Sequence, residues 1–300
     1  MIIFGLEGTA WNLSAALVDE KGVIYEKSAT YIPAKGGIHP REASQHHAEY
    51  MPEVVGDVLS HARDNDLKID GIAFSQGPGL GPCLRTVATA ARTLSLHYEL
   101  PLIGVNHCVS HIEVGKWQSG AVDPAVIYVS GANSQVLALR QGRYRIFGET
   151  LDISVGNAID KFARSVGLPH PGGPKVEELA RNARQYIALP YTVKGMDLSF
   201  SGLSTAASEA AKKNDLADVC YSLQETAFAM LVEVTERAMA HAEKKEAMLV
   251  GGVGANKRLA EMLTIMCEER GARFFLPPRK FMGDNGSMIA YTGLIMYKSG

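Results

Sequence analysis

The sequence predicts an α/β protein made of two duplicated lobes around a central cleft. Three short strands joined by tight turns occupy the first thirty residues, and the same trio of strands returns from Ala125. Each trio is followed by helical periodicity and then by a buried strand that runs into glycines. Two β-β-β-α-β-α units in one chain of 300 residues indicate a duplication. Ligands of open α/β sheets bind beyond the carboxyl ends of the strands, so chemistry is expected in the cleft.

The first lobe is expected to span residues 1–118. Alternating hydrophobic residues between turn residues predict its first three strands, and a continuous apolar run before Gly77-Pro78-Gly79 predicts its fourth. A helix that carries two histidines is expected near the end of this lobe. The predicted strands are Ile2–Leu6, Leu13–Val18, Val23–Thr30 and Gly71–Ser75.

The second lobe is expected to span residues 119–300 and repeats this pattern. Its buried strand runs into a glycine-rich turn, and a helix starts near Lys257. The last helix, over residues 285–297, is expected to pack back toward the first lobe. The predicted strands are Ala125–Val129, Val136–Leu139, Tyr144–Thr150 and Ala247–Val250.

Composition narrows the class of protein. Hydrophobic residues make up 46% of the chain, which is enough for a substantial core in each lobe. A net charge of −2 excludes RNA binding through the overall field, so any contact with RNA must be local or shared with a partner. Four scattered cysteines without a Cys-x-x-Cys pair favour reduced thiols. With no apolar run near 18 residues and no signal peptide, a cytoplasmic protein away from membranes is expected.

His107 and His111 are the most informative residues of the chain. On a helix, residues four apart share one face, so both imidazoles can reach a single metal ion. Zincin peptidases place a glutamate base directly after the first histidine, whereas Cys108 stands there in this chain. A metal site is therefore plausible without a peptidase mechanism, and two unrelated histidines on a partly buried helix remain the alternative. The adjacent pair His46-His47 is interpreted as surface, because neighbouring residues point apart on a helix.

Three turns rich in glycine and small polar residues lie at matching places in the two lobes. Such turns can aim backbone N–H groups at phosphates, although glycine and asparagine also occur in turns for steric reasons alone. Their recurrence in a duplicated architecture favours nucleotide binding. The turns are Glu7-Gly8-Thr9, Ser130-Gly131-Ala132-Asn133-Ser134 and Gly251-Gly252-Val253-Gly254-Ala255-Asn256.

Together with the hairpin turns, the last of these motifs resembles the superfamily of actin, sugar kinases such as hexokinase, and Hsp70. Members of that superfamily clamp a nucleotide between two ribonuclease-H-like lobes. Within it, almost the whole chain is similar to the tRNA threonylcarbamoyltransferase family in its archaeal and eukaryotic form, the catalytic subunit of the KEOPS complex. The motifs that carry this resemblance are Gly36-Gly37-Ile38-His39-Pro40, Ser75-Gln76-Gly77-Pro78-Gly79-Leu80-Gly81-Pro82, Asn106-His107-Cys108-Val109-Ser110-His111 and Asp197-Leu198-Ser199-Phe200-Ser201-Gly202-Leu203.

The resemblance implies one divalent metal ion per chain and a nucleotide site. Iron is the expected metal, since a tyrosinate ligand would favour it, and zinc is the alternative. No covalent nucleophile is expected, and Glu7, Asn133 and Gly252 are expected to support the site. The implied metal ligands are His107, His111, Tyr128 and Asp284. The implied substrate and nucleotide residues are Tyr128, Val129, Ser130, Gly131, Ala132, Asp160, Gly173, Glu177 and Asn256.

Several of these residues also have a structural interpretation. Tyr128 could pack against the sheet, Asp160 could lie on a solvated helix face, and Glu177 could favour the dipole at a helix start. Asp284 could cap the last helix. Ala132 stands where the family has a second glycine, and alanine would be strained if that position needed a positive φ.

The activity implied by the resemblance is transfer of the threonylcarbamoyl group from threonylcarbamoyl-AMP to N6 of adenosine 37 in tRNAs that read codons beginning with A. ATP, ADP, AMP or their analogues are expected to bind in the cleft. Two alternatives remain: a nucleotide-binding scaffold without catalysis, and an ATP-dependent kinase of the same superfold. A kinase would need an aspartate base in the first lobe, and no clear candidate stands beside Glu7.

The resemblance also implies partners. They are a small kinase or ATPase subunit that docks near the cleft-facing helices, a dimerising small subunit, a tRNA-binding subunit of KEOPS, and tRNA. The dimerising subunit is placed on helices of the first lobe, where Tyr50–Leu59 and Ala88–Leu96 offer apolar faces. Relatives continue past Gly300 into a charged tail, and some are fused there to the kinase, so an absent tail or kinase domain is expected.

Overall fold

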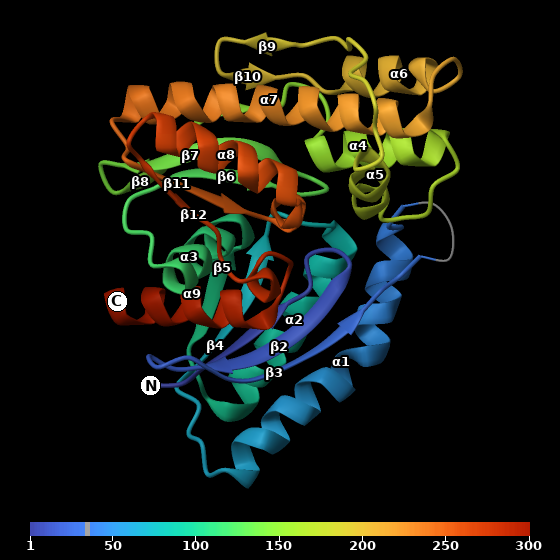
Figure 1. Cartoon of the computed structure of the whole chain (residues 1–300). Coiled ribbons are helices and arrows are strands. Elements are labelled where there is room, and N and C mark those ends of the chain that lie inside the picture. The colour runs from blue at the N-terminus through green and yellow to red at the C-terminus, as the bar shows by residue number, and fades with distance from the viewer. Residues whose placement is uncertain (34–36) are drawn as a thin grey trace. The chain divides into compact units, whose positions relative to one another are not determined.

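The computed structural model describes residues 1–33 and 37–300 (Figure 1). The chain divides into two compact units. Unit 1 comprises residues 1–114 and 283–300, and unit 2 comprises residues 115–282. The sequence placed the division at residue 118 and counted the last helix with the second lobe, whereas the structure counts this helix with unit 1. Gly36, the first residue of the earliest motif, lies outside the described residues.

Unit 1 is built on a mixed sheet of five strands in the order β3-β2-β1-β4-β5. The first three strands are antiparallel to one another, and β4 and β5 continue the sheet in parallel with β1. Its strands are β1 (Ile3–Glu7), β2 (Asn12–Val18), β3 (Val23–Thr30), β4 (Gly71–Gly77) and β5 (Leu102–Asn106). Its helices are α1 (Pro40–Asp64), α2 (Gly81–Tyr98), α3 (His107–Ser119, in unit 1 as far as Val114) and α9 (Gly286–Ser299).

Strands β1 and β2 are buried at every residue. Helix α9 packs on one face of this pair, and α1 and α2 pack on the sheet as well, so both faces are covered. Close approach of α9 needs small residues. A Cβ on Gly5 would lie 2.4 Å from the amide nitrogen of Ala290, and a Cβ on Gly286 would lie 2.7 Å from the carbonyl carbon of Ala15. These two glycines let the end of the chain lie against its first strands.

Unit 2 repeats the topology with the order β12-β11-β6-β7-β8. Three antiparallel strands again come first in the chain, and two parallel strands complete the sheet. Its strands are β6 (Ala125–Val129), β7 (Ser134–Arg140), β8 (Arg143–Glu149), β11 (Glu246–Val250) and β12 (Arg273–Phe275), with a small ribbon of β9 (Val193–Lys194) and β10 (Asp197–Leu198). Its helices are α4 (Val155–Ser165), α5 (Gly172–Ala180), α6 (Ser201–Ala210), α7 (Leu216–Ala242) and α8 (Lys257–Glu269), with 3-10 turns η1 (Gly252–Ala255) and η2 (Arg279–Phe281).

The duplication predicted from the sequence is confirmed. Both units carry the same strand order, and each predicted strand lies within two residues of an observed one. Each unit has a hydrophobic core of its own. The core of unit 1 surrounds Phe4, Leu6 and Phe74, and the core of unit 2 surrounds Phe162 and Phe228. Each core is the hydrophobic face that the alternation in the strands and the periodicity in the helices predict.

The apolar faces expected on the first-lobe helices are mostly used inside unit 1. Val54, Val55 and Val58 of α1 and Ala91 of α2 belong to its core, because these helices cover its sheet. Leu96 is different, with an exposed fraction of 81%. The expectation that Tyr50–Leu59 and Ala88–Leu96 present free apolar faces to a subunit is therefore wrong for most of their apolar residues.

None of the four cysteines forms a disulfide, which agrees with the reduced thiols that the sequence predicts. Burial raises the pKa of Cys83 to about 11 and that of Cys220 to about 12, which keeps both thiols protonated. Within residues 1–33 and 37–300, no helix combines the length and the apolar character that a membrane span requires.

Candidate metal centre and nucleotide-binding turns

The two histidines of the predicted metal site stand where strand β5 passes directly into helix α3. His107 is the first residue of this helix, and His111 lies one turn later on the same face, with the ring centroids 4.8 Å apart. Both residues are buried, with exposed fractions of 6% and 1%. The side-chain oxygen of Asn106 accepts the amide of Val109 at 3.0 Å and so satisfies the start of the helix.

Asp284 reaches the histidines from the far end of the sequence. Its Oδ1 lies 3.2 Å from Nε2 of His111 and 3.6 Å from Nε2 of His107. One ligand atom from each of the three residues lies within 4.8 Å of the others. Ligands at 2.0–2.2 Å from a tetrahedral ion are about 3.4 Å apart, so the three side chains could hold one divalent metal ion.

The side chain of Asp284 is not needed to cap helix α9, because neighbouring residues provide the cap and fix the backbone. Asn285 caps helix α9, since its side-chain oxygen accepts the amide of Met288 at 2.8 Å. The structure thus assigns to Asn285 the capping role that was an alternative for Asp284. Nδ2 of Asn12 donates to the carbonyl oxygen of Asp284 at 2.8 Å and fixes the backbone there. Sequence analysis missed Asn12, and its only signal is an asparagine at the start of a buried strand.

Glu7, at the end of β1, contacts the outer nitrogen of a histidine ligand. Its carboxylate is fully buried, with Oε2 lying 3.1 Å from Nδ1 of His107 and Oε1 accepting the amide of Thr9 at 2.7 Å. If Nδ1 of His107 donates its proton to Glu7, Nε2 keeps its lone pair toward Asp284. This is the arrangement by which a carboxylate orients a metal-binding imidazole.

The ionisation states of the cluster suit a divalent cation. Burial disfavours the charged form of His107, but Glu7 and then Asp284 outweigh burial and raise the pKa of this imidazole to about 9. Burial lowers the pKa of His111 and keeps it neutral. Burial opposes ionisation of Asp284, but its bond to His111 and the charge on His107 lower the pKa of the carboxyl group. A metal ion would replace the proton on His107, whereas His111 and Asp284 are already in the deprotonated forms that bind a metal.

His47 is buried on α1, so its interpretation as a surface residue is wrong. Its ring lies under the turn after β1, where a Cβ on Gly8 would be 3.2 Å from His47 Cδ2. Among the described residues, Nε2 of His47 has no hydrogen-bond partner. Burial, with a smaller contribution from His46, lowers the pKa of His47 to about 4. His47 is therefore a neutral side chain that packs against the turn after Glu7.

In unit 2, the predicted phosphate-binding turn between β6 and β7 is closed by Ser130. Its hydroxyl oxygen accepts the amides of Ala132 at 3.2 Å and Asn133 at 3.0 Å, so these N–H groups already have a partner. The hydroxyl of Ser154, which caps α4, donates to the carbonyl of Gly131 at 2.6 Å. Ala132 does not have a positive φ, and the strain expected from the missing glycine is absent at this residue.

Gly251 lies against this hairpin, and Tyr128 lies in its first strand. Gly251, after β11, has a φ of +93°, and a Cβ there would lie 2.3 Å from the carbonyl oxygen of Val129. The glycine-rich turn after β11 therefore lies against the last residue of β6, next to the Ser130 turn. Tyr128 is buried in β6, and its hydroxyl accepts a bond from Nδ2 of Asn133 at 3.4 Å. Tyr128 belongs to unit 2, and its role as a metal ligand stays a prediction.

Asp160 caps a helix and does not lie on a solvated face. From α4, its Oδ1 accepts the amide of Gly172 at 2.7 Å, at the start of α5. Its Oδ2 lies 3.6 Å from Nδ1 of His170. Space is open beside Gly173, the second residue of α5, and beside Gly252, where an added Cβ would meet no atom within 4 Å. A ligand could approach the backbone at both glycines.

Glu177 and Asn256 meet at the start of α8. Oε1 of Glu177 accepts the amide of Lys257 at 3.2 Å, which ties α5 to α8. Asn256 caps α8 through its side-chain oxygen, which accepts the amides of Arg258 and Leu259, and its Nδ2 donates to Gln224 at 3.0 Å. Both side chains therefore have hydrogen-bond partners within unit 2, and the nucleotide-binding roles of both residues remain predictions.

The motif Asp197–Leu203 is organised by a residue that sequence analysis missed. Asp152 accepts the amide of Phe200 at 2.9 Å and both the amide and the hydroxyl of Ser201. Although burial opposes ionisation, these bonds and one from Ser199 hold the pKa of Asp152 well below its usual range. Asp152 therefore anchors the start of α6, which gives the motif a structural role.

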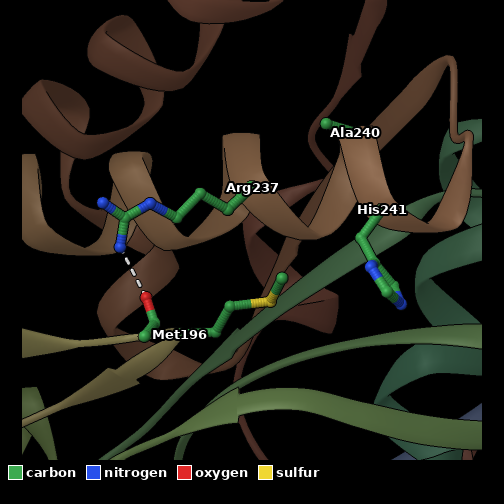
Figure 2. Close-up of a pocket in the computed structure, with 5 residues that line it drawn as sticks. Met196, Arg237, Ala240 and His241 are labelled. Carbon is green, nitrogen blue, oxygen red and sulfur yellow. Dashed lines mark hydrogen bonds between the residues drawn. The ribbon is translucent and has the colours of Figure 1, made fainter.

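A shallow pocket in unit 2 does not contain predicted site residues. Gly195, Met196, Arg237, Ala240 and His241 line it (Figure 2). Arg237 donates to the carbonyl of Gly195 and pairs with Glu233, so its charge is already neutralised within the fold. The buried cluster of His107, His111 and Asp284 is the stronger candidate for the chemistry.

Comparisons with known proteins identify the family of the chain. The model of the tRNA N6-adenosine threonylcarbamoyltransferase family matches residues 22–291. A tRNA N6-adenosine threonylcarbamoyltransferase of Methanothrix thermoacetophila is 77% identical over all of this chain and 93% of its own length. A probable bifunctional tRNA threonylcarbamoyladenosine biosynthesis protein of Methanosarcina mazei is 68% identical over 99% of this chain, which spans 55% of that longer relative.

The fold is shared with more distant proteins. A ROK hexokinase from Thermus thermophilus superposes over the whole of both chains with a TM-score of 0.57 and 14% identity. This likeness confirms the predicted hexokinase-like fold and, at that identity, concerns the fold alone. Because the family model covers most of the chain and a transferase is 77% identical to it, the chain belongs to the tRNA N6-adenosine threonylcarbamoyltransferase family.

Proposed function

We propose that this chain transfers the threonylcarbamoyl group from threonylcarbamoyl-AMP to N6 of adenosine 37 in tRNAs that read codons beginning with A. The observation that carries the proposal is the buried group of His107, His111 and Asp284 in a chain of this family. The reaction is proposed to take place in the cytoplasm.

Positioning and electrostatics supply the rate in this proposal. N6 attacks the carbonyl carbon, a C–N bond forms, AMP leaves with the bonding electrons, and N6 gives up a proton. Iron, or alternatively zinc, bound by His107, His111 and Asp284 with Tyr128 as a further ligand, would supply Lewis-acid stabilisation of the charge that develops. Glu7 holds the His107 ring in place by the 3.1 Å contact at Nδ1. Direct transfer needs no covalent nucleophile.

The adenylate half of the donor is proposed to bind unit 2. Open space beside Gly173 and Gly252 supports this, because a phosphate can approach backbone N–H groups only where side chains leave room. The start of α5 also presents the positive end of its helix dipole. The residues proposed for this side are Tyr128, Val129, Ser130, Gly131, Ala132, Asp160, Gly173, Glu177 and Asn256, with Asn133 and Gly252 in support.

Partners are proposed from the family and from the longer relatives. The Methanosarcina mazei relative is named bifunctional, and this chain matches 55% of its length, which supports a second activity that acts together with the transferase. We identify that activity with the small kinase or ATPase of KEOPS. The other proposed partners are the dimerising subunit, the tRNA-binding subunit and tRNA itself.

The test is transfer of labelled threonyl carbon from threonylcarbamoyl-AMP into tRNA, with the partner subunits added. Label should reach adenosine 37 with the wild type and with His97→Ala, a change at an exposed histidine of α2. With His107→Ala, transfer should fall at least about 100-fold, because a ligand is lost from the cluster. No label with the wild type and every partner present would contradict the proposal and favour a nucleotide-binding scaffold.

A further inference from the structure

The tip of the β7–β8 hairpin carries three arginines that the proposed chemistry does not use. Gln141 and Gly142 form its turn, with φ values of +52° and +72°, as in a two-residue type I′ turn. The register pairs Arg140 with Arg143 and Ala138 with Arg145. Paired residues and residues two apart share a face of a β-ribbon, so all three arginine side chains leave the hairpin from one face.

These arginines have no charge partner within the part of the chain that the structure describes. All three are exposed, and neither an ion pair nor a side-chain hydrogen bond is found for Arg140, Arg143 or Arg145 in that part. Like charges directly opposite each other destabilise a pair of strands. Hairpin stability therefore does not explain Arg140 facing Arg143, and a ligand that carries negative charge would.

Two other cations of unit 2, Lys244 and Arg237, are neutralised by the fold. Lys244, just after α7, pairs with Asp123 and donates to the carbonyl of Leu139 at 2.9 Å, which places it beside the last residues of β7. Arg237, further back on α7, donates to the carbonyl of Gly195 (Figure 2) and pairs with Glu233. The arginines at the tip are different because they are exposed to solvent and no described carboxylate pairs with them.

We propose that Arg140, Arg143 and Arg145 form a binding surface for the phosphate backbone of RNA. A guanidinium group offers a planar fork of donors that matches phosphate oxygens. The chain has a net charge of −2, so its overall field does not attract RNA, and a local cluster must supply the attraction. The proposal rests on the proposed function, since the RNA in question is the tRNA substrate.

The test compares the triple variant Arg140→Gln/Arg143→Gln/Arg145→Gln with a control of equal charge change, Lys21→Gln/Lys68→Gln/Lys213→Gln, which alters exposed lysines. Affinity of the full chain for a fluorescent tRNA transcript is measured over a range of salt concentrations. The arginine variant should bind at least about tenfold more weakly, with a salt slope reduced by about 2 to 3, and the control should change less than about twofold. An unchanged affinity in the arginine variant, or an equal loss in the control, would overturn the proposal.

A second variant guards against a misfolded hairpin. Arg140→Lys/Arg143→Lys/Arg145→Lys keeps the charge but not the fork, so it should restore most of the salt slope and part of the affinity. If it binds no better than the glutamine variant, charge at the tip does not bind RNA. A surface that serves an acidic protein would leave the tRNA affinity of every variant unchanged, which also overturns the proposal.

Failure of this inference is separable from failure of the proposed function. Threonylcarbamoyl transfer by the wild type, with partners present, tests the function directly. If the wild type binds tRNA through the hairpin but transfers nothing, the function is wrong and the surface stands. If transfer occurs and the KM for tRNA is the same in the glutamine variant, the surface is wrong and the function stands.

Discussion

Units 1 and 2 share one strand order but place different chemistry where the first strand ends. In unit 1, β1 ends at Glu7, a buried carboxylate bonded to the imidazole of His107. In unit 2, the equivalent β6 is followed by Ser130, whose neutral hydroxyl closes the turn. The comparison teaches that the backbone of this fold fixes where a site lies. The residues where the first strand passes into its turn decide whether the site gathers charged or neutral polar groups.

The largest effect is expected from removing a charge from the unit 1 cluster. Asp284→Asn replaces an ionised ligand by a neutral amide, so metal affinity should fall at least about 100-fold. Metal content after dialysis, measured by mass spectrometry, checks this. Asp66→Asn is the matched control, because Asp66 is exposed and asparagine tolerates its positive φ. Equal metal content in both variants would place the metal elsewhere.

The next effect concerns Glu7, which distinguishes the first turn of unit 1 from that of unit 2. Glu7→Gln keeps the shape of the side chain but removes the charge beside Nδ1 of His107. Metal affinity should fall by about 10- to 100-fold, as it does when an outer partner of a metal-binding histidine is lost. Titration with Zn²⁺ or Fe²⁺ measures it, and Glu49→Gln on the exposed side of α1 is the control. An unchanged affinity would mean that Glu7 does not orient the ring.

Sequence analysis predicted the two duplicated units because alternation in strands and glycines in turns are local signals. The histidine pair also lies within one turn of helix. Asp284 lies far from both histidines in the sequence, so spacing could not join them, and only the family resemblance did. His47 shows the limit of a local rule. Adjacent residues on a helix do point apart, but one of the two can still face the core. His47 is the one that does.

Unit 2 shows a second limit of sequence analysis. The turn at Ser130 was identified from its residues, but which groups take its N–H bonds depends on the rotamer of the serine. The role of Asp152 in the motif carries no local signal, since its partners there are 47 to 49 residues away. Sequence patterns therefore predict elements and turns well, whereas the bonds between distant polar side chains need the structure.

His47 should make unit 1 sensitive to acid. Its pKa is about 4 in the folded chain and about 6.5 when unfolded, so between these values the unfolded state binds more protons. Its contribution to stability is complete above pH 6.5 and is lost as the pH falls toward 4, by roughly 1 to 2 kcal/mol between pH 7 and pH 5. Urea unfolding across this range should show a smaller loss for His47→Leu. Parallel pH profiles of the two proteins would contradict the prediction.

Asn256 tests whether the neutral groups of unit 2 serve structure alone. Asn256→Ala removes the cap of α8 and should cost about 1 kcal/mol in unfolding free energy. Asn256→Asp keeps the capping oxygen, so thermal stability should stay near that of the wild type. Its added charge should still weaken AMP binding, as measured by calorimetry, if an adenylate binds beside it. Equal AMP affinity for Asn256→Asp and the wild type would limit Asn256 to capping.

The smallest effect is expected at Ala132, where the family resemblance implies a glycine. Because Ala132 does not have a positive φ, alanine fits its backbone without strain, and it restricts the unfolded chain more than glycine does. Ala132→Gly should therefore lower the unfolding free energy by about 0.5 kcal/mol. A stabilised variant would show that the turn is strained by alanine. Since Ser130 already accepts the amide of Ala132, AMP affinity should also stay within about twofold. A clear gain in affinity would mean that the turn opens on binding and frees these N–H groups for the phosphate.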